Sequence, residues 1–252
     1  MVIGSMLVGN TAGQLWIVQE KSPPLLVLWD KGNQVFYLAG DVESDASLDA
    51  LRSTVTDQLL PEARAAGVRR FKVRALSPSL ETSLPRLFPL PLRPTITRFA
   101  VHDTARHRGG PRPHLPGVIF LPITPELLAS DKPAGMEYVR EEIQGMWPSD
   151  DRFHAHGFGI LAVAGNEVIC WCTAEYVGPT YCGIGIATAE DFQGRGVATA
   201  AAGRFVREAR VRGLTPCWEC DTANIASVRV AEKAGFVRQA EETYWIGSLD
   251  VR

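Results

Sequence analysis

The pattern of hydrophobic and polar positions divides the chain into short strands and amphipathic helices. In the first half, apolar runs at 25–29 and 35–39 flank a four-residue turn of hairpin composition, which predicts a β-hairpin. Apolar residues at helical spacing predict a helix over 47–66 with Ser47 as its cap, and Gly67 follows where a terminating glycine is typical. Further elements are expected at 71–75 (strand), 80–88 (helical turn) and 96–101 (strand).

The second half alternates strands with helices. A helix is expected over 197–212, because residues at 197, 201, 205 and 209 place apolar side chains on one face. Another helix is expected over 225–234, with Gly235 as its terminating residue. The other expected elements span 119–123, 158–164, 168–176, 182–188, 216–220 and 243–246 (strands) and 125–129 (a short helix). This mixture predicts an α/β (α+β) fold.

Residues 89–116 differ from both halves. Six prolines fall in this segment, and Arg106, Arg108 and Arg112 lie beside the pair Gly109-Gly110. Such a composition indicates a linker between domains, although the arginines could instead hold a phosphate. We therefore expect an α/β domain of unknown role over 1–115, ending in this Pro/Arg-rich linker, and a second domain over 116–252.

Composition and charge exclude several classes of protein. Hydrophobic residues make up 46% of the 252 residues and charged residues 21%, which is ordinary for a globular chain. The net charge of −2 argues against nucleic acid as a partner. No apolar stretch approaches the ~20 residues that cross a bilayer, and no basic segment or cleavage site marks a secretory signal. We therefore expect a cytoplasmic protein without a membrane partner; its oligomeric state, a homodimer included, stays open.

Five cysteines lie in the C-terminal third of the chain. The odd number and low density do not fit a secreted disulfide scaffold. Cys217 and Cys220 have the spacing of half a zinc site, but Cys170 and Cys172 would make a poor second half. All four fall in expected strands, so we expect buried thiols and no metal.

The segment with the clearest chemistry is the sequence IGIATAEDFQGRGVAT at 184–199. An expected strand ends, and a turn containing Gly194, Arg195 and Gly196 leads directly into an expected helix. The start of a helix presents unpaired N–H groups and a positive dipole end, and the glycines let an anion approach the backbone. This indicates a phosphate site; the alternative is a glycine turn that only starts the helix. Neither the P-loop pattern nor the dinucleotide G-x-G-x-x-G pattern occurs here.

A resemblance narrows this interpretation. The sequence Gln193-x-x-Gly196-x-Ala198 resembles the [Q/R]-x-x-G-x-[G/A] acyl-CoA signature of the GNAT superfamily of N-acyltransferases. Asn224-x-x-Ser227 and the segment EKAGF at 232–236 resemble the family's later motifs, in order and at its spacing. The resemblance covers roughly 117–247, and the whole chain is similar to a two-domain bacterial branch. It implies a C-terminal GNAT-type mixed sheet with flanking helices, preceded by a smaller α/β domain.

The resemblance also implies ligands and roles. Acetyl-CoA would be the acyl donor, without a metal, and its pantetheine arm would pair with a strand edge exposed where a bulge splays two central strands. The pyrophosphate would contact the N–H groups of 194–199. The implied CoA-binding residues are Ile186, Ala187, Thr188, Gln193, Gly194, Arg195, Gly196, Val197, Ala198, Thr199, Asn224 and Ser227. Asn224 has an alternative role, because asparagine is a good helix cap.

Two familiar catalytic positions of the family differ in this chain. Gly183 stands where relatives often carry a Glu that acts as the general base. Ala231 stands where many carry a Tyr that acts as the general acid. Glu219 is the first candidate for a replacement base and Glu175 the second, and each could instead be a paired or exposed strand carboxylate. Ser227 and Cys182 are weaker candidates for proton transfer.

The function implied is acetyl transfer from acetyl-CoA to a primary amine of a small molecule, by direct attack. The alternatives are an acyl-CoA-binding regulatory protein without turnover and a protein or peptide N-acetyltransferase. The absent Glu and Tyr favour the passive binder, whereas correct positioning alone can supply much of the rate.

Overall fold

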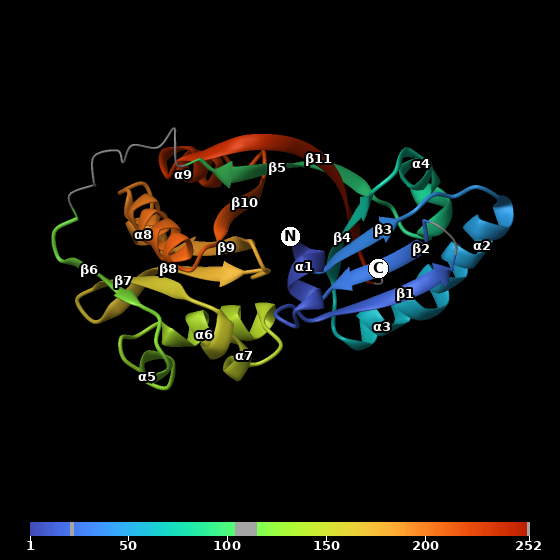
Figure 1. Cartoon of the computed structure of the whole chain (residues 1–252). Helices are drawn as coiled ribbons and strands as arrows, with labels where there is room; N and C mark the ends of the chain where they lie inside the picture. The colour runs from blue at the N-terminus through green and yellow to red at the C-terminus, as the bar shows by residue number, and fades with distance from the viewer. Residues whose placement is uncertain (21–22, 104–114, 251–252) are drawn as a thin grey trace. The chain divides into compact units, whose positions relative to one another are not determined.

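The structure is a computed structural model that describes residues 1–20, 23–103 and 115–250, and it consists of two compact units (Figure 1). The first unit comprises Met1–Thr11 and Thr97–Glu242, and the second comprises Ala12–Ile96 and Thr243–Arg252. Each unit is therefore built from two separate parts of the chain, and the expected boundary at 115/116 falls inside the first unit. Most of the expected Pro/Arg-rich linker, at 104–114, lies outside the described residues.

The second unit is a sheet with helices on it. Its strands lie in the order β1-β2-β3-β4-β11. The expected hairpin is confirmed, because β2 and β3 pair antiparallel from Leu26↔Ala39 to Asp30↔Val35. Strand β1 was not expected from the sequence. The bounds are β1 Gly13–Gln19, β2 Leu25–Asp30, β3 Val35–Ala39, β4 Arg70–Ala75, α2 Asp45–Ser53, α3 Leu60–Ala65 and α4 Pro78–Leu87.

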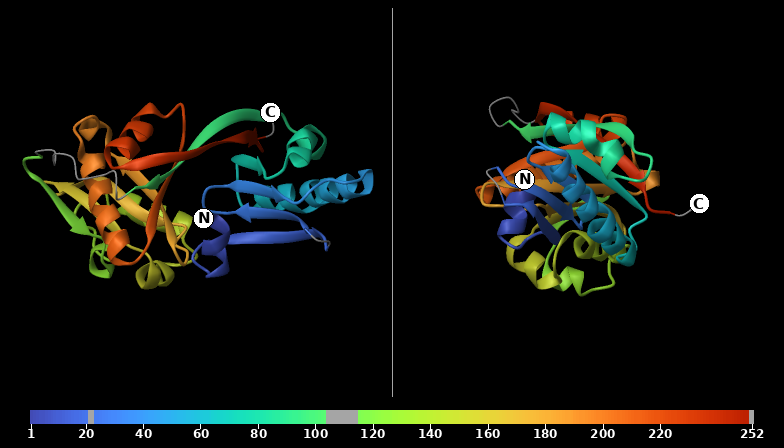
Figure 2. Two further views of the ribbon diagram at one scale, coloured as in Figure 1. Left: turned by 45° about the horizontal axis from the view of Figure 1, so that its top comes forward. Right: turned by 90° about the vertical axis from the view of Figure 1, so that its right-hand side faces the viewer.

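The long helical stretch of this unit differs from its expectation at its start. Helix α2 begins at Asp45, and Ser44 is its cap, because the Ser44 side chain accepts a hydrogen bond from the Ser47 N–H. The expectation of Ser47 as the cap was therefore wrong by three residues. A π-helical segment, Thr54–Leu59, joins α2 to α3. The stretch packs along the sheet (Figure 2), and Gly67 follows it with a φ of 77°, as expected.

The first unit contains the first part of β11, which is divided between the two units, and then the remaining strands in the order β5-β10-β9-β8-β7-β6. Helix α8 packs on one face of β7 to β9, and α6 packs on the other (Figure 1). The strands are β5 Arg93–His102, β6 Val118–Pro122, β7 Gly159–Ala164, β8 Glu167–Glu175, β9 Tyr181–Thr188, β10 Thr215–Asp221 and β11 Phe236–Ser248. The helices are α1 Val2–Leu7, α5 Pro125–Leu128, α6 Met136–Met146, α7 Asp150–His156, α8 Val197–Val211 and α9 Ile225–Lys233. In the described part of the chain, no helix combines the length and hydrophobicity that crossing a membrane requires.

The first eleven residues pack in the first unit although they are far from it in sequence. The Asn10 side-chain amide donates to the Val177 carbonyl at 2.8 Å, and Arg152 Nε donates to Asn10 Oδ1 at 2.7 Å. Asn10 is 4% exposed, so both bonds are shielded from water. The chain start therefore adds buried hydrogen bonds to the unit that contains the expected CoA motif.

We expect a fragment over 116–242 not to fold cooperatively, whereas a fragment over 97–242 does. The longer fragment retains the part of β5 from Thr97 to its end, which lies between β10 and β11 and pairs with β10 from Cys217↔Val101 to Asp221↔Thr97. Without β5, the edge of β10 loses its ladder of hydrogen bonds. Thermal unfolding followed by circular dichroism measures the difference. A sharp transition at the same midpoint in both fragments would contradict the structural role of β5.

Candidate functional site

Strands β9 and β10 start together and then diverge. They pair in parallel at Thr215↔Tyr181 and Pro216↔Cys182, and within the described residues no later pair joins them. Beyond this point β10 pairs with β5. The edge of β9 that faces β10 is therefore free from Gly183 to the end of the strand. On its other edge β9 pairs with β8 from Cys170↔Thr188 to Glu175↔Gly183 without a shift in register, so the divergence needs no bulge there.

The glycine turn after β9 leads into the start of α8, as the sequence predicts. Gly194 and Gly196 have φ angles of 72° and 85°, in the left-handed region that favours glycine. Gly196 is the N-cap residue of α8 and offers no side chain to cap it, and the Ala200 N–H is the one that bonds back to the Gly196 carbonyl. The N–H groups of Val197, Ala198 and Thr199 therefore precede the first intrahelical bond and point toward the turn.

The rest of the turn is held by its own side chains. The Gln193 amide donates to the Thr188 carbonyl at 3.1 Å, which ties the turn to the end of β9. The Arg195 guanidinium lies over the Phe192 ring at 5.3 Å and is exposed to solvent. A Cβ atom at Gly194 would meet no atom within 4 Å, so the turn is open on that side. Open space, free N–H groups and a positive charge are what a pyrophosphate group requires.

Asn224 and Ser227 have structural roles at the start of α9. The Asn224 side chain caps the helix by accepting a hydrogen bond from the Ser227 N–H at 3.1 Å, as its alternative role predicts. Trp218 Nε1 donates to Ser227 Oγ at 3.0 Å. Both residues follow β10 across the divergence from β9, so a further contact with a pantetheine arm stays a prediction.

Two glycines of β9 lie where neighbouring side chains occupy the space above the strand. A Cβ atom at Gly183 would lie 3.1 Å from Tyr176 Cδ2 and 3.3 Å from the Glu175 carbonyl oxygen. At Gly185, a Cβ atom would collide with Glu175 Oε1 and lie 2.8 Å from Glu142 Oε1. A side chain at either position would displace these groups. The carboxyl group of Glu175, whose Cα pairs with that of Gly183, therefore lies above Gly185.

Glu142 completes a pair of carboxyl groups that the sequence analysis missed. Both carboxyl groups reach the same point above Gly185, Glu175 from β8 and Glu142 from α6, and they are hydrogen-bonded to each other. Burial raises the pKa of Glu142, and the hydrogen bond to Glu175 acts in the opposite direction. The buried residues of α6, at 136, 139, 143 and 146, follow a helical spacing that would have predicted this helix.

We expect Glu142→Gln to raise thermal stability near pH 8 and to change it much less near pH 4. Because the folded-state pKa lies above the ordinary value of 4.5, the stability linked to neutral Glu142 is present below 4.5 and is lost as the pH rises through the raised pKa. Glutamine is uncharged throughout and avoids this loss. Melting temperatures measure this gain in stability, because each kcal/mol of unfolding free energy shifts the midpoint by about 2–4 °C in a protein of this size. The control is Glu137→Gln, on an exposed position of the same helix; an equal gain in that variant would contradict the burial of Glu142.

The other candidates for proton transfer are placed less favourably. Glu219, the first candidate from the sequence, is exposed on β10, and its Cα pairs with that of Phe99 on β5. Burial raises the pKa of the Cys182 thiol, which keeps it protonated at neutral pH. Ala231 is 5% exposed and packs in a cluster with Trp218 and Phe236. The structure thus brings Glu175 into a carboxyl pair and places Glu219 on an exposed position of β10.

The cysteines lie as expected. Four are buried, Cys220 is partly buried, and none is in a disulfide. Burial raises the pKa of Cys170 and of Cys217 to about 11. Within the described ranges, no group of three or more His, Cys, Asp or Glu side chains is placed to hold a metal ion.

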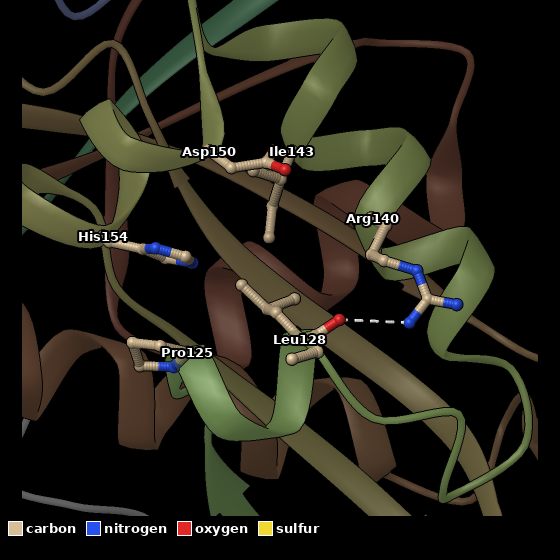
Figure 3. A pocket seen from close by; sticks show the side chains of 7 residues that line it. Pro125, Leu128, Arg140, Ile143, Asp150 and His154 are labelled. Atoms are coloured by element: carbon tan, nitrogen blue, oxygen red, sulfur yellow. Dashed lines mark hydrogen bonds between the residues drawn. The ribbon is translucent and has the colours of Figure 1, made fainter.

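Two pockets of the first unit adjoin helix α6. One, of about 560 Å³, lies between α6, β8 and the end of β9. The other, of about 150 Å³, lies between α5, α6 and α7 (Figure 3). In the smaller pocket the Arg140 guanidinium is already bonded to the carbonyls of Leu128 and Ser130, both at 3.1 Å. No residue of β9 or of the glycine turn lines it, so it is a packing crevice between helices and the larger pocket is the candidate site.

Comparisons with known proteins agree with this geometry. A family model described as GNAT acetyltransferase matches residues 122–245. An uncharacterized N-acetyltransferase of Bacillus subtilis (strain 168), YdfB, is 30% identical over 129 residues, which are 51% of this chain and 48% of that protein. The chain thus spans about half the length of the curated relative that it matches.

Solved structures share the fold of the whole chain. A GCN5-related N-acetyltransferase-like protein from Streptococcus suis 89/1591 has a TM-score of 0.63 at 18% identity, over 95% of this chain and 89% of that one. A GCN5-related N-acetyltransferase from Kribbella flavida has a TM-score of 0.59 at 14% identity, over 100% of this chain and 97% of that one. Since the matched segment contains both the glycine turn and the divergent strands β9 and β10, residues 122–245 belong to the GNAT acetyltransferase family.

Proposed function

We propose that this protein is an acetyl-CoA-dependent N-acetyltransferase that acetylates a primary amine of a small molecule. The observation that carries the proposal is the free edge of β9, which ends in an open glycine turn at the start of α8. An extended pantetheine arm fits a free strand edge, and a pyrophosphate fits the N–H groups at the end of that edge.

The CoA-binding roles follow from this placement. The backbone of Ile186, Ala187 and Thr188 pairs with the pantetheine arm, and Asn224 and Ser227 contact it from across the divergence. The turn binds the pyrophosphate through Gln193, Gly194, Arg195 and Gly196 and the N–H groups of Val197, Ala198 and Thr199. These roles are supported by the openness of the turn and by the absence of capping side chains at α8.

The reaction is direct attack of the neutral amine nitrogen on the thioester carbonyl carbon. The C–N bond forms, the C–S bond breaks with its electron pair on sulfur, and a backbone N–H of the free β9 edge donates to the developing oxyanion. An alkyl amine is mostly protonated at neutral pH and must lose a proton before it attacks. We assign Glu175 as the group that accepts this proton, because its carboxyl group lies above Gly185, next to the free edge.

Two other functions are the alternatives to this proposal. A passive acyl-CoA binder is favoured by Gly183 and Ala231, which lack the side chains of the family's usual base and acid. The Glu142–Glu175 carboxyl pair weakens that argument, since it places a proton acceptor near the same strand. A protein or peptide acetyltransferase would need an open groove for an extended chain. Cytoplasmic localisation stays a prediction, and the oligomeric state stays open.

Release of free CoA thiol from acetyl-CoA tests the proposal. We expect acceptor-dependent release with small primary amines and much less with peptides. Binding of CoA without acceptor-dependent release from any amine or peptide would identify a passive binder. Release with peptides alone would identify a peptide acetyltransferase.

A further inference from the structure

The pocket between α6 and β8 has an acidic and aromatic lining. The pocket has a volume of about 560 Å³. One wall contains Tyr138, Glu141 and Glu142, and the opposite wall contains Glu167 and Trp171. None of the twelve residues that line it is Lys, Arg or His. Carboxylates together with the faces of Trp and Tyr rings are the groups that bind organic cations.

The pocket leads to the point where the proposed reaction takes place. Glu142 belongs both to the lining and to the carboxyl pair above Gly185. Thr173, whose Cα pairs with that of Gly185, lies on the same face of the sheet, since directly paired residues share a face. Its side chain is 2% exposed, and within the described part of the chain its hydroxyl has no hydrogen-bond partner. The Thr173 hydroxyl is therefore available to a hydrogen bond with a bound ligand or an ordered water.

We propose that this pocket is the acceptor site and that it selects amines carrying a second positive charge. The inference rests on the proposed function and adds the substrate class. The reactive ammonium group displaces the contact between the Glu175 and Glu142 carboxyl groups and binds to both of them and to the Thr173 hydroxyl. The second cationic group lies near Glu141, Glu167 and the Trp171 ring.

This placement accounts for every proton of the transfer. The ammonium group gives its first proton to the Glu175 carboxylate, and the resulting neutral nitrogen attacks the carbonyl carbon. When the C–S bond breaks, the second proton of the nitrogen passes to the departing thiolate, which leaves CoA thiol and a neutral amide. The Glu175 carboxyl group then gives its proton to water, which regenerates the carboxylate. The product has lost the positive charge at its reacting end, so its attraction to the carboxyl pair falls and product release is favoured.

Three acceptors of equal carbon count test the charge preference on the full-length protein. They are 1,4-diaminobutane, butylamine and 4-aminobutyrate, whose second groups are cationic, absent and anionic. We expect kcat/KM to fall in this order, with about a tenfold preference for the diamine over butylamine at low salt, from one to two partly exposed ion pairs. In Glu141→Gln/Glu167→Gln the diamine-to-butylamine ratio should fall toward one. The matched control is Glu137→Gln, which neutralises an exposed acid of α6 outside the pocket and should leave the ratio unchanged.

Failure of this inference is distinguishable from failure of the proposed function. Turnover without a preference for the diamine, or with a preference that the double variant retains, would overturn the acceptor pocket and leave the acetyltransferase proposal intact. If no amine gives turnover, calorimetry of 1,4-diaminobutane against CoA-saturated protein decides the matter. Binding that weakens in the double variant supports the pocket while the enzyme proposal fails, and the absence of binding overturns the pocket.

Discussion

Replacing Gly196 by aspartate is expected to weaken CoA binding about tenfold to a hundredfold relative to asparagine at the same position. Gly196 is the N-cap residue of α8 with a φ of 85°. Asparagine and aspartate have almost the same size and are the residues besides glycine that most readily adopt this conformation. They differ in charge, and a carboxylate at this position opposes a pyrophosphate bound to the same N–H groups.

The comparison of these two variants separates charge from backbone strain. Calorimetric titration with CoA gives the two dissociation constants, and melting temperatures confirm that both variants fold. Gly213→Asn supplies a second control, because Gly213 follows the other end of α8 with a φ of 74° and open space around it. That variant carries similar strain far from the turn and should bind CoA as the unmodified protein does. Equal affinity of the Asp and Asn variants of Gly196 would place the pyrophosphate elsewhere.

Local features of the chain were predictable from the sequence because short-range chemistry determines them. The hairpin at 25–39 and the glycine turn before α8 require particular residues at fixed offsets, and both lie where the sequence predicts them. The strand over 236–248 was harder to predict from the sequence. The sequence predicted a strand only over 243–246, whereas the structure has one long strand, β11, whose middle residues are mostly polar and exposed or partly exposed.

Features that depend on distant pairing were not predictable in this way. The first unit combines residues 1–11 with 97–242, and no local pattern shows that contact between remote segments. The carboxyl pair has the same origin, since Glu175 reaches the space above Gly185 only through the register of β8 against β9. Glu142 lies on α6, a helix that was not predicted although its apolar residues have helical spacing. Gly183 on its own therefore gave no sign that two carboxyl groups from β8 and α6 lie above the same strand.

Replacing Glu175 by glutamine is expected to lower kcat by about a hundredfold or more at neutral pH, the usual contribution of a general base. Glutamine keeps the size and much of the hydrogen bonding of the side chain but cannot accept the proton of an ammonium group. The loss should shrink as the pH rises toward the pKa of the amine itself, near 10.4 for an alkyl amine, because free amine then forms without a base. The measurement is kcat against pH for both proteins with one identified acceptor.

The matched variant is Glu219→Gln, because Glu219 was the first candidate for the base from the sequence and is exposed on β10. If Glu219→Gln shows the large loss and the altered pH profile instead, the base lies on the far side of the divergence between β9 and β10. If both variants keep the rate and pH profile of the unmodified protein, neither carboxylate is the base, and water accepts the proton. A loss confined to Glu175→Gln and relieved at high pH is the one result that a purely structural role would not produce, because a structural defect would persist when the amine is already neutral.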